Sequence, residues 1–270
     1  MENPAEMALV EDIQRIVWPG SEASIVPIHM LIAAIHGGGI VAGVFDHDKI
    51  IGFVFGFPGF YLTPDGPRLK HCSHMLGVHP DYRDSGIGFR LKRAQWQMVR
   101  HQGIDRITWT FDPLGSRNAH LNITKLGTVC NTYIRDCYGR MEDHLNQGLP
   151  SDRFEVDWWV NSRRVNHRLG KHPRRRVTLE DFHKAEAYIL PALSPLSAGR
   201  STSTPFVLVE IPANFAALRA ENLELSLEWR MHTRAVFETL FEQGYLITDF
   251  IHMDESPASF YVLSHGEATL

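Results

Sequence analysis

Apolar residues recur at helical spacing near the start of the chain. One face is formed by Met7, Val10, Ile13 and Val17. This spacing predicts a helix over about residues 5–18, which the following proline and glycine end. The apolar run from Ile28 to Ile35 predicts a second helix, and the three glycines at 37–39 end it.

Continuous apolar runs then predict strands. They cover Ile40 to Phe45, Ile50 to Phe57 and Leu69 to Val78, with a loop from Pro58 to Pro67. Helical spacing returns at Ile87, Leu91, Ala94 and Met98, and a strand follows over Arg106 to Phe111. We expect Ser116 to cap the next helix, which runs to about Leu126 and ends at Gly127.

The second half of the chain alternates between strands and helices. Strands are predicted from Phe154 to Val160, Phe206 to Ile211, Leu246 to Ile251 and Ser259 to Leu263. Between the first two strands lie a basic linker from Arg163 to Arg176 and a loop from Pro191 to Pro205 that is rich in Ser, Thr and Pro. A long helix then carries one apolar face, formed by Leu225, Trp229, His232, Val236 and Leu240. We therefore predict a first domain over residues 1–150 and a C-terminal α/β lobe over residues 151–270.

The composition is that of an ordinary globular protein. Of 270 residues, 44% are hydrophobic and 21% are charged, with a formal net charge of −4. This charge gives no case for nucleic acid or an anionic membrane as a partner. There is no apolar run of membrane-spanning length and no basic leader, and the three cysteines form no paired framework. We expect a cytoplasmic protein.

The stretch from His74 to Lys92 carries the candidate chemistry. A strand-like run up to Val78 is followed by the loop Arg83-Asp84-Ser85-Gly86-Ile87-Gly88, where the helix begins. Glycines allow a close approach of the backbone, and the first N–H groups of a helix bind anions. A phosphate or pyrophosphate would fit there, although a turn without a ligand is an equal alternative. The G-x-G-x-x-G fingerprint fails at Leu91, and no G-K-[ST] follows.

The pattern R-x-x-G-x-G after L-G-V-x-P closely resembles the acetyl-CoA loop of the GNAT superfamily of N-acetyltransferases. The order of predicted elements over about residues 5–140 is similar to that family, and so is the N-x-x-x-x-x-x-K-L-G run from Asn118 to Gly127. The whole chain resembles an uncharacterised bacterial branch of predicted GNAT acetyltransferases. The resemblance implies an α/β (α+β) fold with a mixed, mostly antiparallel twisted sheet flanked by helices, and acetyl-CoA as cosubstrate.

The resemblance also implies which residues bind acetyl-CoA. Backbone groups of Leu76, Gly77 and Val78 would contact the pantetheine and the thioester carbonyl. The N–H groups of the loop would hold the pyrophosphate, and these residues are Arg83, Asp84, Ser85, Gly86, Ile87 and Gly88. Asn118 would reach the pantetheine arm.

The sequence departs from the family pattern at two places. The strand that usually precedes the first helix is missing, trimmed or supplied from elsewhere. The position of the usual general-acid tyrosine carries Ile123. Nearby residues that could donate the proton in place of that tyrosine are Tyr133, Tyr138 and Cys130. For each of them a structural role is the more common one.

His74 and Asp112 are the candidates for the general base. His74 lies just before the cofactor-binding segment and has a pKa near neutrality, although a packed strand histidine is an equal alternative. Asp112 ends the strand at the expected cleft, where it could instead begin a turn before Pro113. We predict no metal site, because His71 and His74 would point to opposite faces of a strand.

We therefore predict an N-acyltransferase that moves an acetyl group from acetyl-CoA to the amine of a small-molecule acceptor. The alternative is a non-catalytic CoA-binding or interaction module of the same fold, which Ile123 suggests. A homodimer formed through the C-terminal lobe is a further possibility. The basic linker could bind RNA or the 3′-phosphate of CoA, but a solvated linker is the simpler interpretation, because no aromatic residues interleave with the basic ones.

Overall fold

A computed structural model describes residues 1–20, 22–139, 148–170, 176–196, 204–253 and 256–266. The chain forms two compact units. Unit 1 comprises residues 1–109 and 158–166, and unit 2 comprises residues 110–157 and 167–270. The domain boundary predicted after residue 150 stays a prediction.

Unit 1 is an α/β sandwich built on four strands in the order β1-β2-β3-β4. Its elements are α1 (Pro4–Val17), α2 (Ile28–His36), β1 (Ile40–Asp46), β2 (Lys49–Thr63), β3 (Gly66–Val78), α3 (Ile87–His101) and the first part of β4 (Arg106–Phe111). The first two pairings are antiparallel, and β3 runs parallel to β4. No strand precedes α1 in the described part of the chain, as the sequence indicated.

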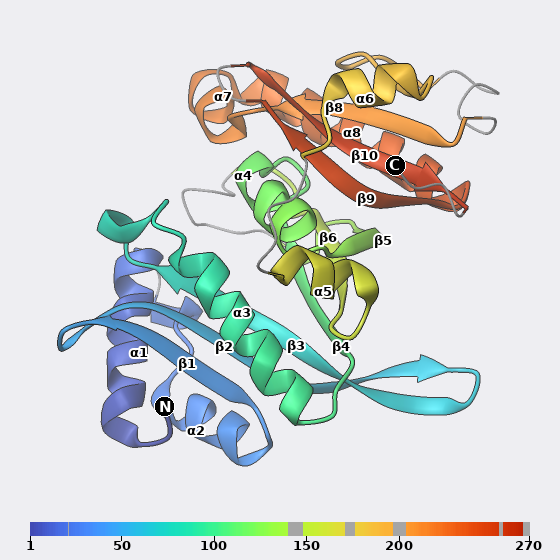
Figure 1. Cartoon of the computed structure of the whole chain (residues 1–270). Coiled ribbons are helices and arrows are strands. Elements are labelled where there is room, and N and C mark those ends of the chain that lie inside the picture. The colour runs from blue at the N-terminus through green and yellow to red at the C-terminus, as the bar shows by residue number, and fades with distance from the viewer. Residues whose placement is uncertain (21, 140–147, 171–175, 197–203, 254–255, 267–270) are drawn as a thin grey trace. The chain divides into compact units, whose positions relative to one another are not determined.

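Helices cover both faces of this sheet (Figure 1). Met7, Val10 and Ile13 of α1 pack with Leu31 of α2 on Phe53. Ile87 and Leu91 of α3 pack on the other face against Ile51 and Val54 of β2. The cap of α1 is local, because Asn3 and Glu6 form a capping box and Pro4 occupies the first helical turn.

The predicted loop from Pro58 to Pro67 is wrong, because β2 and β3 continue as a paired hairpin almost to its end. The pairs run from Pro58 with His71 out to Thr63 with Gly66. Pairing of β1 with β2 ends at Gly56, so Pro58 lies where β2 has a partner on one side only. A proline is tolerated at such an edge, since its missing N–H is not needed for the ladder.

Unit 2 contains the remaining strands in the order β6-β5-β9-β10-β8-β7. Its elements are the end of β4, α4 (Ser116–Ala119), a π-helical turn (His120–Lys125), β5 (Val129–Ile134), most of β6 (Arg153–Trp159), the end of α5 (Arg163–Leu169), α6 (Leu179–Lys184), β7 (Tyr188–Leu190), β8 (Phe206–Pro212), α7 (Phe215–Glu221), α8 (Leu223–Glu242), β9 (Tyr245–His252) and β10 (Ala258–His265). Among the described strands of this unit, β7 with β8 is a parallel pair and the other pairs are antiparallel.

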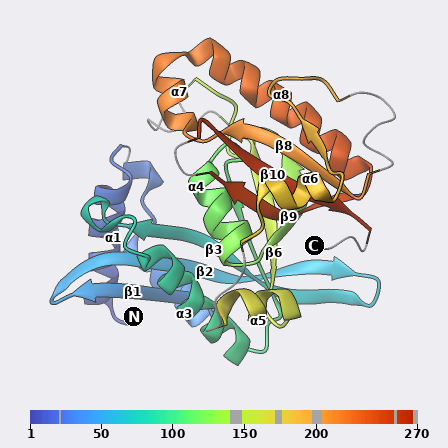
Figure 2. The same cartoon turned by 45° about the horizontal axis from the view of Figure 1, so that its top comes forward.

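The long helix α8 covers one face of the unit 2 sheet (Figure 2). The ring of Phe237 lies 4.8 Å from that of Phe154 on β6 and 5.2 Å from that of Tyr261 on β10. Phe182 of α6 packs with Phe206 and Leu208 in a separate apolar cluster. The predicted fold class is confirmed, since both units combine helices with mostly antiparallel strands.

Three further sequence predictions need correction or restriction. Ser116 is the first helical residue and not the cap, because its hydroxyl donates to Ser259 at 2.9 Å. The linker from Arg163 begins as the helix α5, and its residues 171–175 lie outside the described residues. Residues 197–203 of the Ser/Thr/Pro-rich loop also lie outside the described residues.

Within the described ranges, no helix has the length and apolar character needed to cross a membrane.

Candidate active site

The loop before α3 has the geometry of an anion site. Gly86 has φ +81°, in the left-handed region that favours glycine, and Ile87 begins the helix. No side chain caps the first N–H groups, and a Cβ at Gly86 would meet nothing within 4 Å. These N–H groups therefore lack a side-chain partner at the positive end of a 15-residue helix. This arrangement fits a pyrophosphate.

Neighbouring residues add to this fit. Arg83 is exposed, and among the described residues its side chain forms no hydrogen bond or ion pair. It can therefore reach an anion on the loop. Tyr82 fixes the approach to the loop, because its hydroxyl donates to Asp46 Oδ2 at 2.7 Å and its carbonyl accepts from Ser85 Oγ.

The segment Leu76–Val78 lies on β3 where the strand has a free side. Pairing of β3 with β4 comprises His71 with Ile107 and Cys72 with Thr108, and no further pair follows among the described residues. Gly77 is required for close packing, since a Cβ there would lie 2.7 Å from the Phe53 ring. Backbone groups of this segment are thus available to a ligand on the side away from β2.

His74 occupies a β-bulge. Gly56 pairs with Ser73 and Phe55 pairs with Met75, so His74 has no opposite residue on β2. Bulges redirect side chains and are frequent beside active sites. The His74 ring is exposed and lies 5.8 Å from the ring of Phe55 and 5.7 Å from that of Phe57. Desolvation beside these rings lowers the pKa of His74, so the neutral imidazole is favoured.

A buried polar network behind β3 escaped the sequence reasoning. Lys92 of α3 donates to Ser73 Oγ at 2.7 Å, and its Nζ lies 3.5 Å above the centre of the Trp109 ring. Ser73 donates to Gln95, which contacts His71. Burial lowers the pKa of Lys92 well below its usual value and that of His71 to about 4. The helical periodicity did not predict the burial of Lys92, because a lysine in an amphipathic helix is normally exposed.

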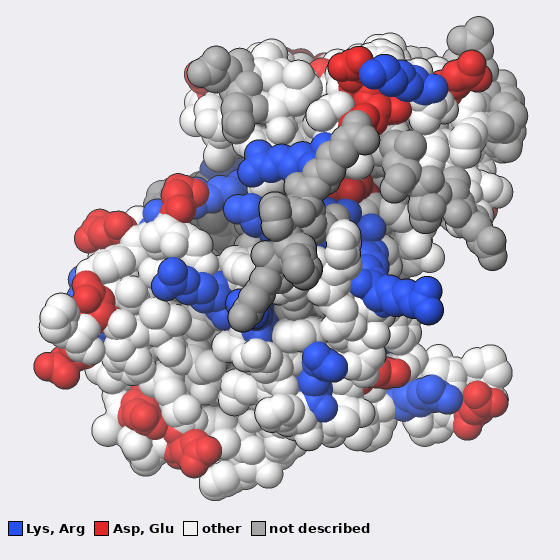
Figure 3. Space-filling model, viewed as in Figure 1, with Lys and Arg blue, Asp and Glu red and all other residues white. Residues whose placement is uncertain are grey.

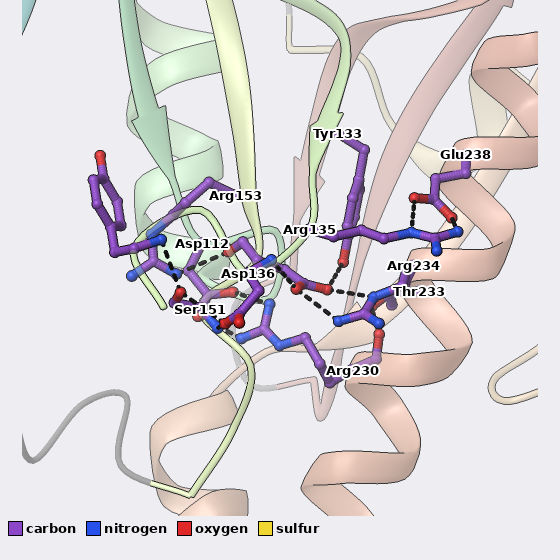
Figure 4. Close-up of polar contacts among 12 residues, drawn as sticks. Asp112, Tyr133, Arg135, Asp136, Ser151, Arg153, Arg230, Thr233, Arg234 and Glu238 are labelled. Atoms are coloured by element: carbon purple, nitrogen blue, oxygen red, sulfur yellow. Dashed lines mark hydrogen bonds and ion pairs between the residues drawn. The ribbon is translucent and has the colours of Figure 1, made fainter. Parts of the chain in front are cut away.

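In unit 2, Asp112 is held by an arginine from α8 (Figure 4). Arg230 donates from Nη1 to Oδ1 at 2.8 Å and from Nη2 to Oδ2 at 2.6 Å. Oδ1 also accepts the Leu114 N–H at 2.8 Å, which forms the expected turn. Both carboxylate oxygens therefore have charged partners, which favours a positioning role over proton abstraction. The Arg230 side chain is only 2% exposed.

A second carboxylate of unit 2 is more deeply buried. Asp152 accepts two hydrogen bonds from Arg234, at 2.8 and 2.9 Å, and one from the Tyr133 hydroxyl at 2.7 Å. Burial and this hydrogen bond raise the pKa of Tyr133 above its usual range. Burial likewise raises the pKa of Cys130. Neither group is suited to give up its proton near neutral pH. Tyr133 was predicted from the sequence and Asp152 was not, because the residues next to Asp152 do not distinguish it from a surface aspartate.

Tyr138 differs from these two candidates. It is 54% exposed, and its hydroxyl lies 2.6 Å from Thr110 Oγ1 on β4. Asn118 is exposed on α4, and Ile123 is fully buried in the π-helical turn, where it offers no proton. π-helical turns are frequent at functional sites.

The predicted residues thus form two groups. The loop Arg83–Gly88, Leu76–Val78 and His74 belong to unit 1, whereas Asp112, Asn118, Tyr133 and Tyr138 belong to unit 2. No group of three or more His, Cys, Asp or Glu residues in the described chain could hold a metal ion.

Comparisons with known proteins find one family model that matches part of the chain. Residues 9–127 match the acetyltransferase (GNAT) family. No curated protein sequence matches the chain. Among solved structures, the chain is similar to aminoglycoside 6′-acetyltransferase type Ii, with 19% identity, a TM-score of 0.46 and coverage of 60% of this chain and 94% of that chain. For the ribosomal-protein-S18-alanine N-acetyltransferase from Escherichia coli, the identity is 12%, the TM-score 0.45 and the coverage 64% and 96%.

The matched residues 9–127 include the R-x-x-G-x-G loop, whose geometry fits the pyrophosphate of acetyl-CoA. These residues, which make up less than half of the chain, are thus similar to the acetyltransferase (GNAT) family.

Proposed function

We propose that this protein transfers the acetyl group of acetyl-CoA to the amine of a small-molecule acceptor. The observation that carries the proposal is the loop Arg83–Gly88, in which uncapped helix N–H groups and a left-handed Gly86 lie next in sequence to an exposed Arg83. Leu76–Val78 would align the pantetheine through their backbone groups. The reaction forms a C–N bond and breaks the thioester C–S bond.

His74 is the proposed general base. An amine nucleophile must lose a proton as it attacks, and a histidine whose pKa is lowered is neutral and ready to accept it. The ring of Phe57 beside His74 is 36% exposed and favours an amine acceptor, since a ring face attracts a cationic group before deprotonation. These contacts support a nitrogen acceptor in preference to an alcohol.

Tyr138 is the proposed proton donor for the leaving thiolate. Its exposure distinguishes it from Tyr133, whose proton is held by buried Asp152. Asp112 is proposed as a positioning residue, because the ion pair with Arg230 fixes the end of β4. Each of these roles is separable by mutation.

Calorimetric titration with CoA and acetyl-CoA tests the binding part of the proposal. Gly86→Glu should abolish binding, because it places bulk and a negative charge on the anion position. Gly103→Glu is the matched control, since Gly103 also has a positive φ, of +74°, with open space around its Cβ, but lies at the other end of α3. Equal affinity of the wild type and Gly86→Glu would overturn the loop assignment.

Turnover tests the acceptor. Release of free CoA thiol should be measured with a panel of small amines and, separately, with peptides bearing a free N-terminus. Faster release with a small amine supports the proposal. Release that depends only on peptides, or on alcohols, would refute the acceptor class while leaving the binding result intact.

A further inference from the structure

The alternation of side chains along β3 is interrupted at His74. Ser73 faces α3, and Leu76 packs in the apolar cluster that α3 forms on β2. Between them, Met75 packs in the cluster that α1 and α2 form on the opposite face, and the His74 ring contacts Phe55 of that cluster. In a regular strand, residues three positions apart point to opposite faces. The bulge therefore places two successive side chains, His74 and Met75, on the same face.

The strand pairing alone does not hold such a bulge in place. Its extra residue is His74, which has no opposite residue on β2. A shift of the extra residue by one position changes the face to which a side chain points. Contacts on both sides of the bulge must therefore hold it, and Leu76 provides one of them in its apolar cluster.

On the other side of the bulge, two residues of α3 hold Ser73. Lys92 Nζ donates to Ser73 Oγ at 2.7 Å, and Ser73 donates its hydroxyl proton to Gln95 Oε1 at 2.8 Å. A hydroxyl that accepts and donates in this way has a fixed direction. Gly56 pairs with Ser73 across the strands. A Cβ at Gly56 would collide with His71 Nε2 and lie 3.0 Å from Gln95 Nε2, so the glycine leaves room for these contacts.

Lys92 differs from the other basic residues of α3. Figure 3 shows blue side chains at the surface over this helix, and Arg90, Arg93 and Arg100 are exposed. Lys92 is instead 3% exposed, and its Nζ lies 3.5 Å from the centre of the Trp109 ring of β4. Within the described residues, no carboxylate pairs with it. Burial of an amine without an ionic partner is costly, and the chain places this one directly behind the bulge.

We propose that Lys92, through its hydrogen bond to Ser73, fixes the bulge and so aims the His74 ring for acetyl transfer. This inference rests on the proposed function, in which His74 is the general base. Because Lys92 acts through Ser73, it is a positioning residue. Misplacement of a reacting group by about 1 Å can cost about 10²-fold in rate. Gln95 and the cluster around Leu76 would still hold part of the bulge without Lys92, so we expect a loss of about 10-fold.

Two-dimensional proton–carbon NMR of the histidine rings tests the positioning directly. The His74 signal is identified by its absence from His74→Ala. Its shift depends on the position of the ring, which lies 5.8 Å from the Phe55 ring and 5.7 Å from the Phe57 ring. Lys92→Met and Ser73→Ala should each move this signal. Ser73→Ala removes a single hydroxyl and keeps the test open should Lys92→Met fail to fold.

Val99→Ala is the matched control. Val99 is fully buried on the same helix, about two turns beyond Lys92, and belongs to no contact of the bulge described above. It should leave the His74 signal in place. An unmoved signal in Lys92→Met or Ser73→Ala would overturn the inference, and so would an equal movement in Val99→Ala.

Turnover tests the catalytic consequence. Lys92→Met should lower kcat about 10-fold. The calorimetric Kd for acetyl-CoA should stay unchanged, because the loop Arg83–Gly88 takes no part in the network. In the His74→Ala background, Lys92→Met should cause no further loss, since both substitutions act through one group. Losses that multiply in the double variant would overturn the inference.

Failure of the proposed function would give a different pattern. If His74→Ala keeps the wild-type kcat while Lys92→Met moves the His74 signal, the assignment of the base fails and the link from Lys92 to His74 stands. If His74→Ala is impaired while Lys92→Met keeps the wild-type kcat, the base stands and the positioning role of Lys92 is refuted.

Discussion

Replacing Arg230 by Met should destabilise the protein by about 3 kcal/mol, because the substitution leaves the Asp112 carboxylate without its charged partner. Removing one member of a fully buried ion pair costs about 3–5 kcal/mol. The side chain of Arg230 is 2% exposed, but that of Asp112 is 23% exposed. Water can therefore reach part of the stranded carboxylate, which places the expected cost at the lower end of that range.

The chain offers a control with the same chemistry and different burial. Arg135 and Glu238 also form a bidentate pair, at 2.6 and 2.7 Å, and Glu238 lies on the same helix α8 as Arg230. Arg135 is 64% exposed and Glu238 23%. Water screens an exposed pair, so Arg135→Met should change the free energy of unfolding much less than Arg230→Met does.

Urea unfolding followed by tryptophan fluorescence measures both variants. The double variant Asp112→Asn with Arg230→Met should recover part of the lost stability, because no unpaired charge then remains. An unfolding free energy of Arg230→Met within about 1 kcal/mol of the wild type would refute the reasoning, and so would equal losses for Arg230→Met and Arg135→Met.

Two further outcomes follow from the site. His74→Ala should lower kcat by about 10²-fold or more, and the acid limb of the wild-type kcat/KM profile should lie below the usual histidine pKa of 6.5; an unchanged kcat would remove His74 as the base. Lys92 has a lowered pKa when folded, so between that pKa and its usual 10.5 the unfolded chain binds more protons and the free energy of unfolding rises with pH. Lys92→Met should lose this rise at pH values just below 10.5, as measured by urea unfolding, and an identical slope in both proteins would show that Lys92 stays charged.

Local sequence determined the conformation of the loop Arg83–Gly88 and most helices and strands. Gly86 adopts a positive φ that few other residues accept, and Ile87 and Leu91 repeat at the helical period. The loop and the helix could therefore be predicted from residues that are neighbours in the sequence. The cap of α1 and the glycine stop after α2 are local for the same reason. The pattern R-x-x-G-x-G therefore indicated the resemblance to GNAT acetyltransferases before any tertiary contact was known.

Only the tertiary structure decided the environment of the reactive groups. Asp112 and Arg230 are 118 positions apart, and no periodicity predicts that they meet. The bulge that frees His74 depends on the register of two strands, and the burial of Lys92 depends on the face that α3 turns to the sheet. The continuation of β2 through Pro58 depends on where β1 ends. Such properties come from packing between distant segments, because burial and register set pKa values and partners that residue type alone leaves open.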